Sequence, residues 1–177
     1  MNYLKLNSFK KGNDFIKFQE GKFEVVFSTA ENNKSFNRNT EEGIRELEAL
    51  IDKFQGENVE YLKQIHSNKV YTYRKGSNEF KDNEGDALIT NEKKVIIGVF
   101  TADCVPVILV DKENEAIAAI HSGWKGTFSS IVTETILRMK EEYNSKAENI
   151  VAYIGPHIRQ CCYEVSEDLK EQFLKKF

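Results

Sequence analysis

Two apolar runs joined by a short polar segment constrain the fold of this chain more than any other feature. The first run is VPVILV at residues 105–110, and the second is EAIAAI at residues 115–120. Aliphatic and β-branched residues in runs of this length are typical of strands within a sheet. The polar residues between the two runs predict a turn, so the pattern indicates two strands that are connected directly.

An acid, a thiol and a proline interrupt the start of the first run. Asp103 belongs to a residue type that is rarely buried without a partner, and Pro106 cannot donate a hydrogen bond to a neighbouring strand. We interpret Pro106 as closing a tight turn from which Asp103 and Cys104 point out of the sheet. The sequence therefore predicts a site at the mouth of this strand, where a metal ion and solvent would satisfy both side chains.

Shorter periodic segments surround these two runs. Alternating or β-branched residues predict strands at 3–7, 14–18, 23–29, 59–65, 70–73, 87–90, 95–100 and 149–155. Apolar residues at helical spacing predict a helix over 41–54 with Thr40 as its N-cap, a second after Thr127 and a third after Ser166. The core face of the second helix is expected to carry Phe128, Ile131, Val132, Thr135 and Met139. This order favours an α+β fold, with mixed β-sheets and outer helices, over a regular βαβ winding.

Length and composition bound the class of protein. The chain has 177 residues, 40% of them hydrophobic, which is long enough and apolar enough for one globular domain. The net charge of −3 gives no broad attraction to nucleic acid or to an anionic membrane. No apolar run approaches the roughly 20 residues that span a bilayer, and the N-terminus lacks the apolar core of a signal peptide. We therefore expect a cytoplasmic protein whose three cysteines are not a disulfide framework.

Three side chains that can bind a metal stand at the ends of predicted strands. His66 follows the strand at 59–65, Cys104 precedes the first apolar run, and His121 follows the second. Strand ends converge where a sheet opens to loops, so the three side chains can form one site. Two imidazoles and a thiolate suit zinc with a fourth position open to water, and they would also suit copper. The alternative is a core histidine, a small buried cysteine and a hydrogen-bonded loop histidine.

The segment HSGWKGT (121–127) is a candidate anion site. Gly123 and Gly126 flank Trp124 and Lys125 and lead into a predicted helix N-terminus, where backbone amides and the helix dipole favour an anion. Lys125 would add a cation, and Trp124 a stacking surface. The spacing is not that of a P-loop, and the alternative is a plain strand-to-helix turn with a core tryptophan.

The segment GPHIRQCCYEV (155–165) follows the last predicted strand. Its Gly-Pro pair turns the chain, so that His157 and Arg159 could face a ligand. Cys161 and Cys162 are better explained as part of a structural turn.

Together these segments resemble the YfiH-type family, also called the laccase-domain or polyphenol oxidase family of purine nucleoside phosphorylases. The matching segments stand in the family's order and are QIHSNKV (64–70), DALIT (86–90), TADCVPVILVD (101–111), AAIHSGWKGT (118–127) and IGPHIRQCCYEV (154–165). The resemblance implies a layered sandwich of sheets and helices that is peculiar to this family. It also implies that the family continues past Phe177, so we expect one domain over residues 1–177 that lacks the family's C-terminal segment.

The resemblance implies that His66, Cys104 and His121 bind zinc. The implied activities are phosphorolysis of adenosine, inosine, guanosine and methylthioadenosine, and deamination of adenosine. Zinc would make a bound water acidic enough to attack C6 of adenosine, with Asp103 as general acid/base or as a residue that orients a ligand. In phosphorolysis, phosphate would attack C1′, held by Lys125 and the backbone amides of 123–127. We expect a monomer or weak homo-oligomer that binds a purine nucleoside and phosphate, with no nucleic-acid or membrane partner.

Three other functions would use the same residues. Copper oxidation of phenols fits poorly, because a laccase needs several coppers with their own histidine ligands and this chain has three histidines. A thiol hydrolase, acting on amides or on peptidoglycan precursors, would use Cys104 as nucleophile and His121 as base. A metal-stabilised binding or scaffold protein is the alternative without catalysis.

Overall fold

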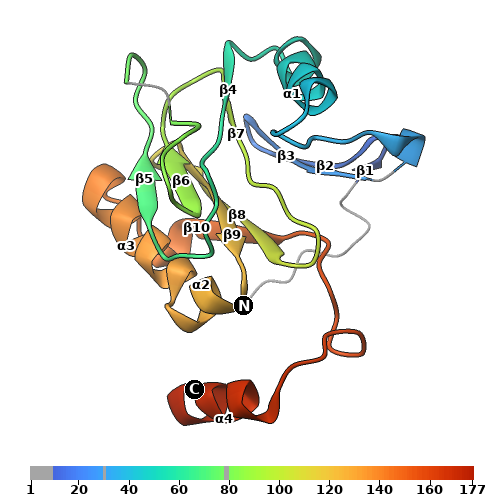
Figure 1. The fold of residues 1–177 in the computed structure, drawn as a ribbon. Coiled ribbons are helices and arrows are strands. Elements are labelled where there is room, and N and C mark those ends of the chain that lie inside the picture. The colour runs from blue at the N-terminus through green and yellow to red at the C-terminus, as the bar shows by residue number, and fades with distance from the viewer. Residues whose placement is uncertain (1–9, 30, 78–79) are drawn as a thin grey trace.

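The computed structural model describes residues 10–29, 31–77 and 80–177, and it shows the mixed α+β architecture that the sequence predicts (Figure 1). Within these residues the strands form sheets of five, three and two strands. A helix covers one face of the five-stranded sheet and the three-stranded sheet covers the other, so the arrangement is a layered sandwich. The strand predicted at 3–7 lies outside the described residues.

The five-stranded sheet has the strand order β10-β8-β9-β6-β5. Its strands are β5 (Val70–Thr72), β6 (Ala87–Thr90), β8 (Val105–Asp111), β9 (Ala116–Ser122) and β10 (Ile150–Ile154). The two apolar runs of the sequence are neighbours, because β8 pairs antiparallel with β9 along its whole length. Only β5 among these strands runs parallel to its partner, β6. The sequence correctly predicts both strands and the turn between them.

The residues of β8 alternate between two hydrophobic cores. Val107 and Leu109 pack in a cluster with Ile131 and Met139 of helix α3 (Ile131–Tyr143). Val110 belongs to the opposite cluster, which includes residues of β3 (Phe23–Ser28). Successive side chains of a strand point to opposite faces, so one strand joins both layers. Each fully buried side chain of this size stabilises the fold by about 1.5–3 kcal/mol.

The three-stranded sheet forms the layer opposite α3. It consists of β1 (Lys10–Lys11), β2 (Phe15–Glu20) and β3, all antiparallel. In the two-residue turn between β2 and β3, Gly21 has φ 60°, a left-handed conformation that glycine adopts without strain. Val25 and Phe27 of β3 pack on Val110 and on Tyr153 of β10.

Helix α1 (Glu41–Lys53) and a parallel pair, β4 (Asn58–Glu60) and β7 (Val95–Ile97), form a smaller unit. The N-cap prediction is confirmed: the Thr40 hydroxyl accepts a hydrogen bond from the Gly43 N–H at 3.1 Å. Leu47 of α1 packs against Val59 and Tyr61. Short 3-10 turns also occur at Glu31–Asn33 and Ala147–Asn149.

The helix predicted after Thr127 is two helices. Residues Trp124–Phe128 form the short α2, and α3 begins at Ile131, because Ser130 has φ 62° and breaks the helix between them. Thr127 is therefore not an N-cap; its hydroxyl lies 2.8 Å from that of Ser122. The predicted core face of α3 is confirmed for Ile131, Thr135 and Met139, which are all fully buried.

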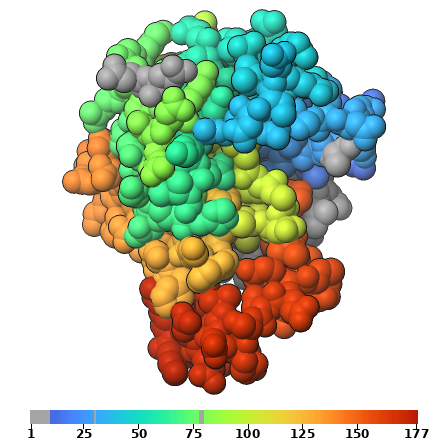
Figure 2. All heavy atoms as spheres, viewed as in Figure 1, coloured from blue at the N-terminus to red at the C-terminus, as the bar shows by residue number. Residues whose placement is uncertain are grey.

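Helix α4 (Glu167–Lys176) lies apart from the sheets. It begins after Ser166, as predicted, and the Ser166 hydroxyl accepts a hydrogen bond from the Leu169 N–H at 3.4 Å. Its Phe173 ring meets Phe128 of α2 at 5.3 Å between centroids. Figure 2 shows the last part of the chain, in red, as a lobe beside and below α2. Among the described residues, no helix is both long and apolar enough to cross a membrane.

Two further local expectations are wrong. The strand predicted at 59–65 ends at Glu60, since the apolar Tyr61 and Leu62 are buried by side-chain packing and not by strand pairing. Pro106 lies within β8 opposite His121, and not in a turn. It is tolerated there because β10 begins to pair with β8 only at Val107, so no bond to β10 needs the missing N–H.

The last strand, β10, lies at the edge of the five-stranded sheet. It pairs only with β8 among the described strands. Tyr153 is buried, but Ile154 is 63% exposed. An apolar sequence alone does not distinguish an edge strand from a central one, because both bury one face.

Candidate metal centre

The three predicted ligands converge. Among the described residues, His66, Cys104 and His121 place one ligand atom each within 4.8 Å of one another. His66 Nε2 lies 3.8 Å from Cys104 Sγ, and the two imidazole rings meet edge to face at 4.7 Å between centroids. In a tetrahedral zinc site with ordinary bond lengths, nitrogen and sulfur ligands lie about 3.6 Å apart. The donor set and its spacing therefore fit a zinc ion.

Each ligand is held by a different kind of local structure. His121 lies inside β9 and is 3% exposed. Cys104 directly precedes β8 and is half-buried. His66 is exposed on a loop after β4, where it has φ 61°, a conformation that non-glycine residues rarely adopt. The centre therefore has a buried side at His121 and an open side at His66.

Asp86, directly before β6, contacts two parts of this centre. It is fully buried, accepts a hydrogen bond from the Nδ1 atom of His121 at 2.8 Å, and accepts others from the loop that carries His66. Burial alone would raise the pKa of Asp86, but hydrogen bonds from His121 and Ser67 outweigh it and lower that pKa to about 2. The sequence contains this residue in the DALIT segment, yet nothing in its spacing pointed to a role.

Gly123 leaves room for the ligands. A Cβ atom at this position would lie 2.7 Å from His66 Cδ2 and 3.2 Å from Cys104 Sγ. Contacts under 3.0 Å are not tolerated without displacement, so any other residue would push the two ligands apart. The backbone at Gly123 therefore forms part of the wall of the centre, whereas the sequence predicted this glycine as part of a turn whose amides face an anion.

The Cys104 thiol is not poised as a free nucleophile. Burial raises its pKa above the ordinary value of 9.0, and the charges of Asp103 and Asp86 raise it further. Thiolates that attack substrates have lowered pKa values. The Cys104 sulfur contacts His66 Nε2 at 3.8 Å, whereas the predicted nucleophilic pair was Cys104 and His121. The contact with His66 and the convergence of all three side chains favour a metal site over the Cys104–His121 pair of a thiol hydrolase.

The other predicted site residues lie around the three ligands. Asp103 is exposed beside Cys104, and its main-chain carbonyl accepts from the Ile158 N–H at 3.0 Å. Trp124 and Lys125 are both exposed on α2, with the Lys125 ammonium 5.5 Å from the Trp124 ring. Trp124 is therefore not a core residue. Gly126 is buried, with the main-chain carbonyl of Ser67 3.1 Å from where its Cβ would be.

The hydrogen bond from the Ile158 N–H to the Asp103 carbonyl places the GPHIR segment beside the start of β8. His157 is half-buried and its Nδ1 bonds to the Gly155 carbonyl at 2.8 Å, while Arg159 is exposed. Cys161 and Cys162 are exposed, with their sulfurs 3.3 Å apart. The structure thus places this segment beside Asp103.

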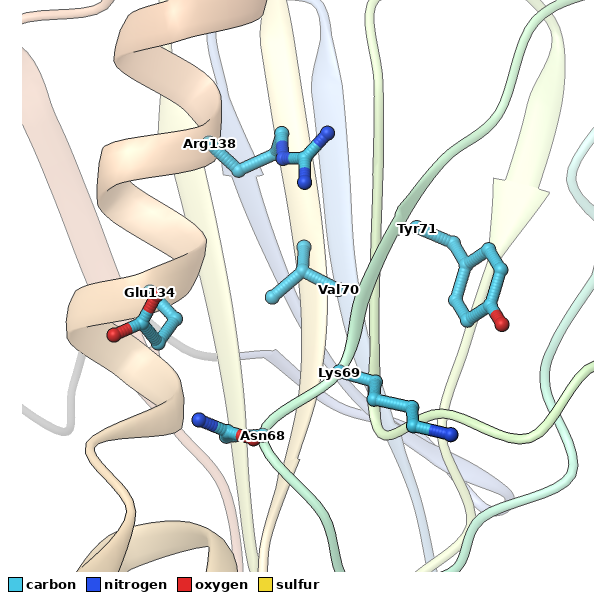
Figure 3. A pocket seen from close by; sticks show the side chains of 6 residues that line it. All are labelled: Asn68, Lys69, Val70, Tyr71, Glu134 and Arg138. Carbon is cyan, nitrogen blue, oxygen red and sulfur yellow. The ribbon is translucent and has the colours of Figure 1, made fainter.

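A hollow of about 360 Å³ begins two residues after His66, between β5 and α3. Figure 3 shows that Val70, Glu134 and Arg138 face the space beside the helix, whereas Lys69 and Tyr71 point away to the other side of the strand. None of the three metal-competent residues lines this hollow. It is therefore a separate surface feature.

Comparison with known proteins identifies related chains. A model of the multi-copper polyphenol oxidoreductase laccase family matches residues 18–177. A purine nucleoside phosphorylase of Clostridium acetobutylicum is 47% identical over 173 residues, covering 98% of this chain and 70% of that protein. A purine nucleoside phosphorylase of Aquifex aeolicus is 43% identical over 122 residues, covering 68% of this chain and 56% of that protein.

Solved structures of low identity share the fold. The YfiH protein of Bacillus licheniformis has a TM-score of 0.80 at 22% identity, covering 94% of this chain and 71% of that one. The protein NMB0706 of Neisseria meningitidis has a TM-score of 0.74 at 26% identity, covering 92% and 70%. The predicted YfiH-type resemblance is confirmed. The chain spans 70% of the Clostridium relative and 56% of the Aquifex one.

Proposed function

Because this chain belongs to the multi-copper polyphenol oxidoreductase laccase family and its relatives are named purine nucleoside phosphorylases, we propose that it is a zinc-dependent purine nucleoside phosphorylase. The observation that carries the proposal is the convergence of His66, Cys104 and His121 within 4.8 Å. The proposed substrates are adenosine, inosine, guanosine and methylthioadenosine with phosphate, and adenosine is also deaminated.

A zinc ion held by the two imidazoles and the thiolate would supply Lewis-acid chemistry, polarising an oxygen of a substrate or water. The chain contributes the shape of the site. Burial of His121 in β9 fixes one ligand in the sheet, and Gly123 keeps the space between His66 and Cys104 clear. Because His66 is exposed, reactants reach the centre from the open side.

Residues around the centre have proposed roles in binding the reactants. Asp103, exposed next to Cys104, is the proposed general acid/base, which protonates the purine as it leaves. Lys125 and the amides of the HSGWKGT turn bind phosphate, and Trp124 offers its exposed ring to the purine face. His157 and Arg159, next to Asp103 through the Ile158 contact, bind the nucleoside from the other side.

The first test is product analysis by chromatography with protein of known metal content. Adenosine is incubated with and without phosphate. We expect adenine and ribose 1-phosphate with phosphate, and inosine without it. His121→Ala should lose both bound zinc and both products, because the buried ligand cannot be replaced from solvent.

The matched control is Leu137→Ala, an exposed position on α3. It should keep metal content and turnover. A His121→Ala protein with full zinc occupancy contradicts the metal assignment. Zinc-loaded protein that converts none of the four nucleosides contradicts the phosphorylase. Phenol oxidation only by copper-loaded protein would instead support the activity in the family's name.

A further inference from the structure

Asp86 has more polar contacts than a structural carboxylate at a strand end requires. It directly precedes the buried strand β6, lies in the chain between the segments that carry His66 and Cys104, and is fully buried. An ionised carboxylate only accepts hydrogen bonds. Each contact of its two oxygens is therefore a hydrogen bond from a donor that the fold places there.

One oxygen joins the two histidines. Oδ1 accepts from the backbone N–H of His66 at 2.9 Å and from the imidazole Nδ1–H of His121 at 2.8 Å. The main chain repeats the connection, since the Asp86 carbonyl accepts from the His121 N–H at 2.7 Å. Residues 20 and 35 positions away in the sequence thus meet at one atom.

The other oxygen secures the loop on either side of His66. Oδ2 accepts from the Ser67 N–H at 2.6 Å, from the Ser67 hydroxyl at 2.7 Å and from the Ile65 N–H at 3.3 Å. Three consecutive backbone amides therefore converge on one carboxylate. They hold His66 in its left-handed conformation, which a free loop would leave.

The bond to His121 also decides which nitrogen is available to a metal. Since the carboxylate cannot donate, Nδ1 of His121 must carry the hydrogen, which leaves the lone pair on Nε2. A carboxylate behind a ligating histidine fixes the tautomer and orientation of the ring in this way.

We infer that Asp86 is the positioning residue of the metal centre, fixing the tautomer of His121 and the loop of His66 with one carboxylate. This inference rests on the metal site of the proposed function. Asp103, to which the sequence assigned an orienting role, is exposed, and Asp86 is the carboxylate that the structure places against His121.

The first experiment needs no metal. Only three histidines occur in the chain, so ¹⁵N-histidine NMR of metal-free protein can assign each ring. We expect His121 to show the Nδ1–H tautomer in the wild-type protein. In Asp86→Asn, the side-chain amide can donate to Nδ1, so the Nε2–H tautomer should appear.

The second experiment measures zinc affinity by competition with a chromophoric chelator. Asp86→Asn should bind zinc about 10–100-fold more weakly than wild type, as expected on loss of an outer partner of a metal ligand. The matched control is Asp111→Asn. Asp111 is equally buried and caps a turn through the Glu113 and Asn114 amides, at the opposite end of β8. This variant should keep the wild-type affinity and tautomer.

The outcomes separate this inference from the proposed function. An Nε2–H tautomer of His121 in the wild-type protein overturns the inference even if zinc binds. Folded Asp86→Asn with wild-type affinity and tautomer overturns it as well. If Asp86→Asn does not fold, Ser67→Ala, which removes one bond to Oδ2, must still weaken zinc binding severalfold. Wild-type protein that binds no zinc contradicts the proposed function. The tautomer measurement would still test whether Asp86 fixes the tautomer of His121.

Discussion

Gly123 shows at the scale of one residue how closely the centre is packed. Gly123→Ala would bring a methyl group to 2.7 Å from His66 Cδ2, so we expect His66 and Cys104 to be displaced. Zinc affinity should fall at least tenfold, and turnover with it, because the ligands lose their geometry. The substitution removes no buried apolar group. The melting temperature of metal-free protein should change little, and zinc titration beside a thermal melt checks both.

Gly98→Ala is the control for this substitution. It adds the same methyl group where nothing lies within 4 Å and where the backbone conformation does not demand glycine. It should leave zinc affinity unchanged. Wild-type zinc affinity in Gly123→Ala would show that the ligands do not occupy the positions described.

Single residues also show what the sequence could reveal of the site. The convergence of His66, Cys104 and His121 was predictable because few residue types bind zinc and all three stood near apolar runs. Asp86 was not, because its role depends on donors from two distant segments, and an acid before a strand is otherwise unremarkable. The raised pKa of Cys104 likewise arises from burial and from charges that only the fold brings near.

At the scale of secondary-structure elements, the buried face of helix α3 stabilises the five-stranded sheet. Met139 is fully buried against the five-stranded sheet, so Met139→Ala should lower the free energy of unfolding by about 2–5 kcal/mol. Leu137→Ala removes a similar volume two residues away, where the side chain is 53% exposed, and should cost under about 1 kcal/mol. Urea unfolding of both proteins makes the comparison. Equal losses would contradict the assigned orientation of the helix.

The elements differ in how far the sequence determines them. Helix α1 and the core face of α3 were predictable because their periodicity and caps are local. The break at Ser130 was not, because serine is not a typical left-handed residue and no side-chain cap marks the new helix. The strand predicted at 59–65 failed because side-chain burial and strand pairing produce the same apolar pattern. Only the register of a neighbouring strand separates the two.

At the scale of the whole molecule, Glu20 links layers that are distant in sequence. The Tyr153 hydroxyl of β10 donates to it, and Lys112 pairs with it at 2.7 Å. Hydrogen bonds from Lys112 and Tyr153 lower the pKa of Glu20 below its ordinary 4.5. A lowered carboxyl pKa adds stability above the unfolded value, and this contribution is lost as the pH falls through the folded value.

Glu20→Gln should therefore be less stable than wild type at pH 7. The difference in the free energy of unfolding between the two proteins should narrow as the pH falls below 4.5, because protonation of Glu20 then removes the advantage of the wild type. Urea unfolding at a series of pH values measures the gap. A gap that is constant or widens toward acid would contradict the linkage between Glu20 and its two partners.

The unequal burial of the three ligands has a kinetic consequence. His121 is anchored within the sheet, but His66 stands at the surface on a loop, so an ion can exchange at the exposed ligand while every strand stays paired. Chelators should then strip the centre on a timescale far shorter than global unfolding. Loss of a bound ion would then leave the strands and the hydrophobic cores of the fold intact.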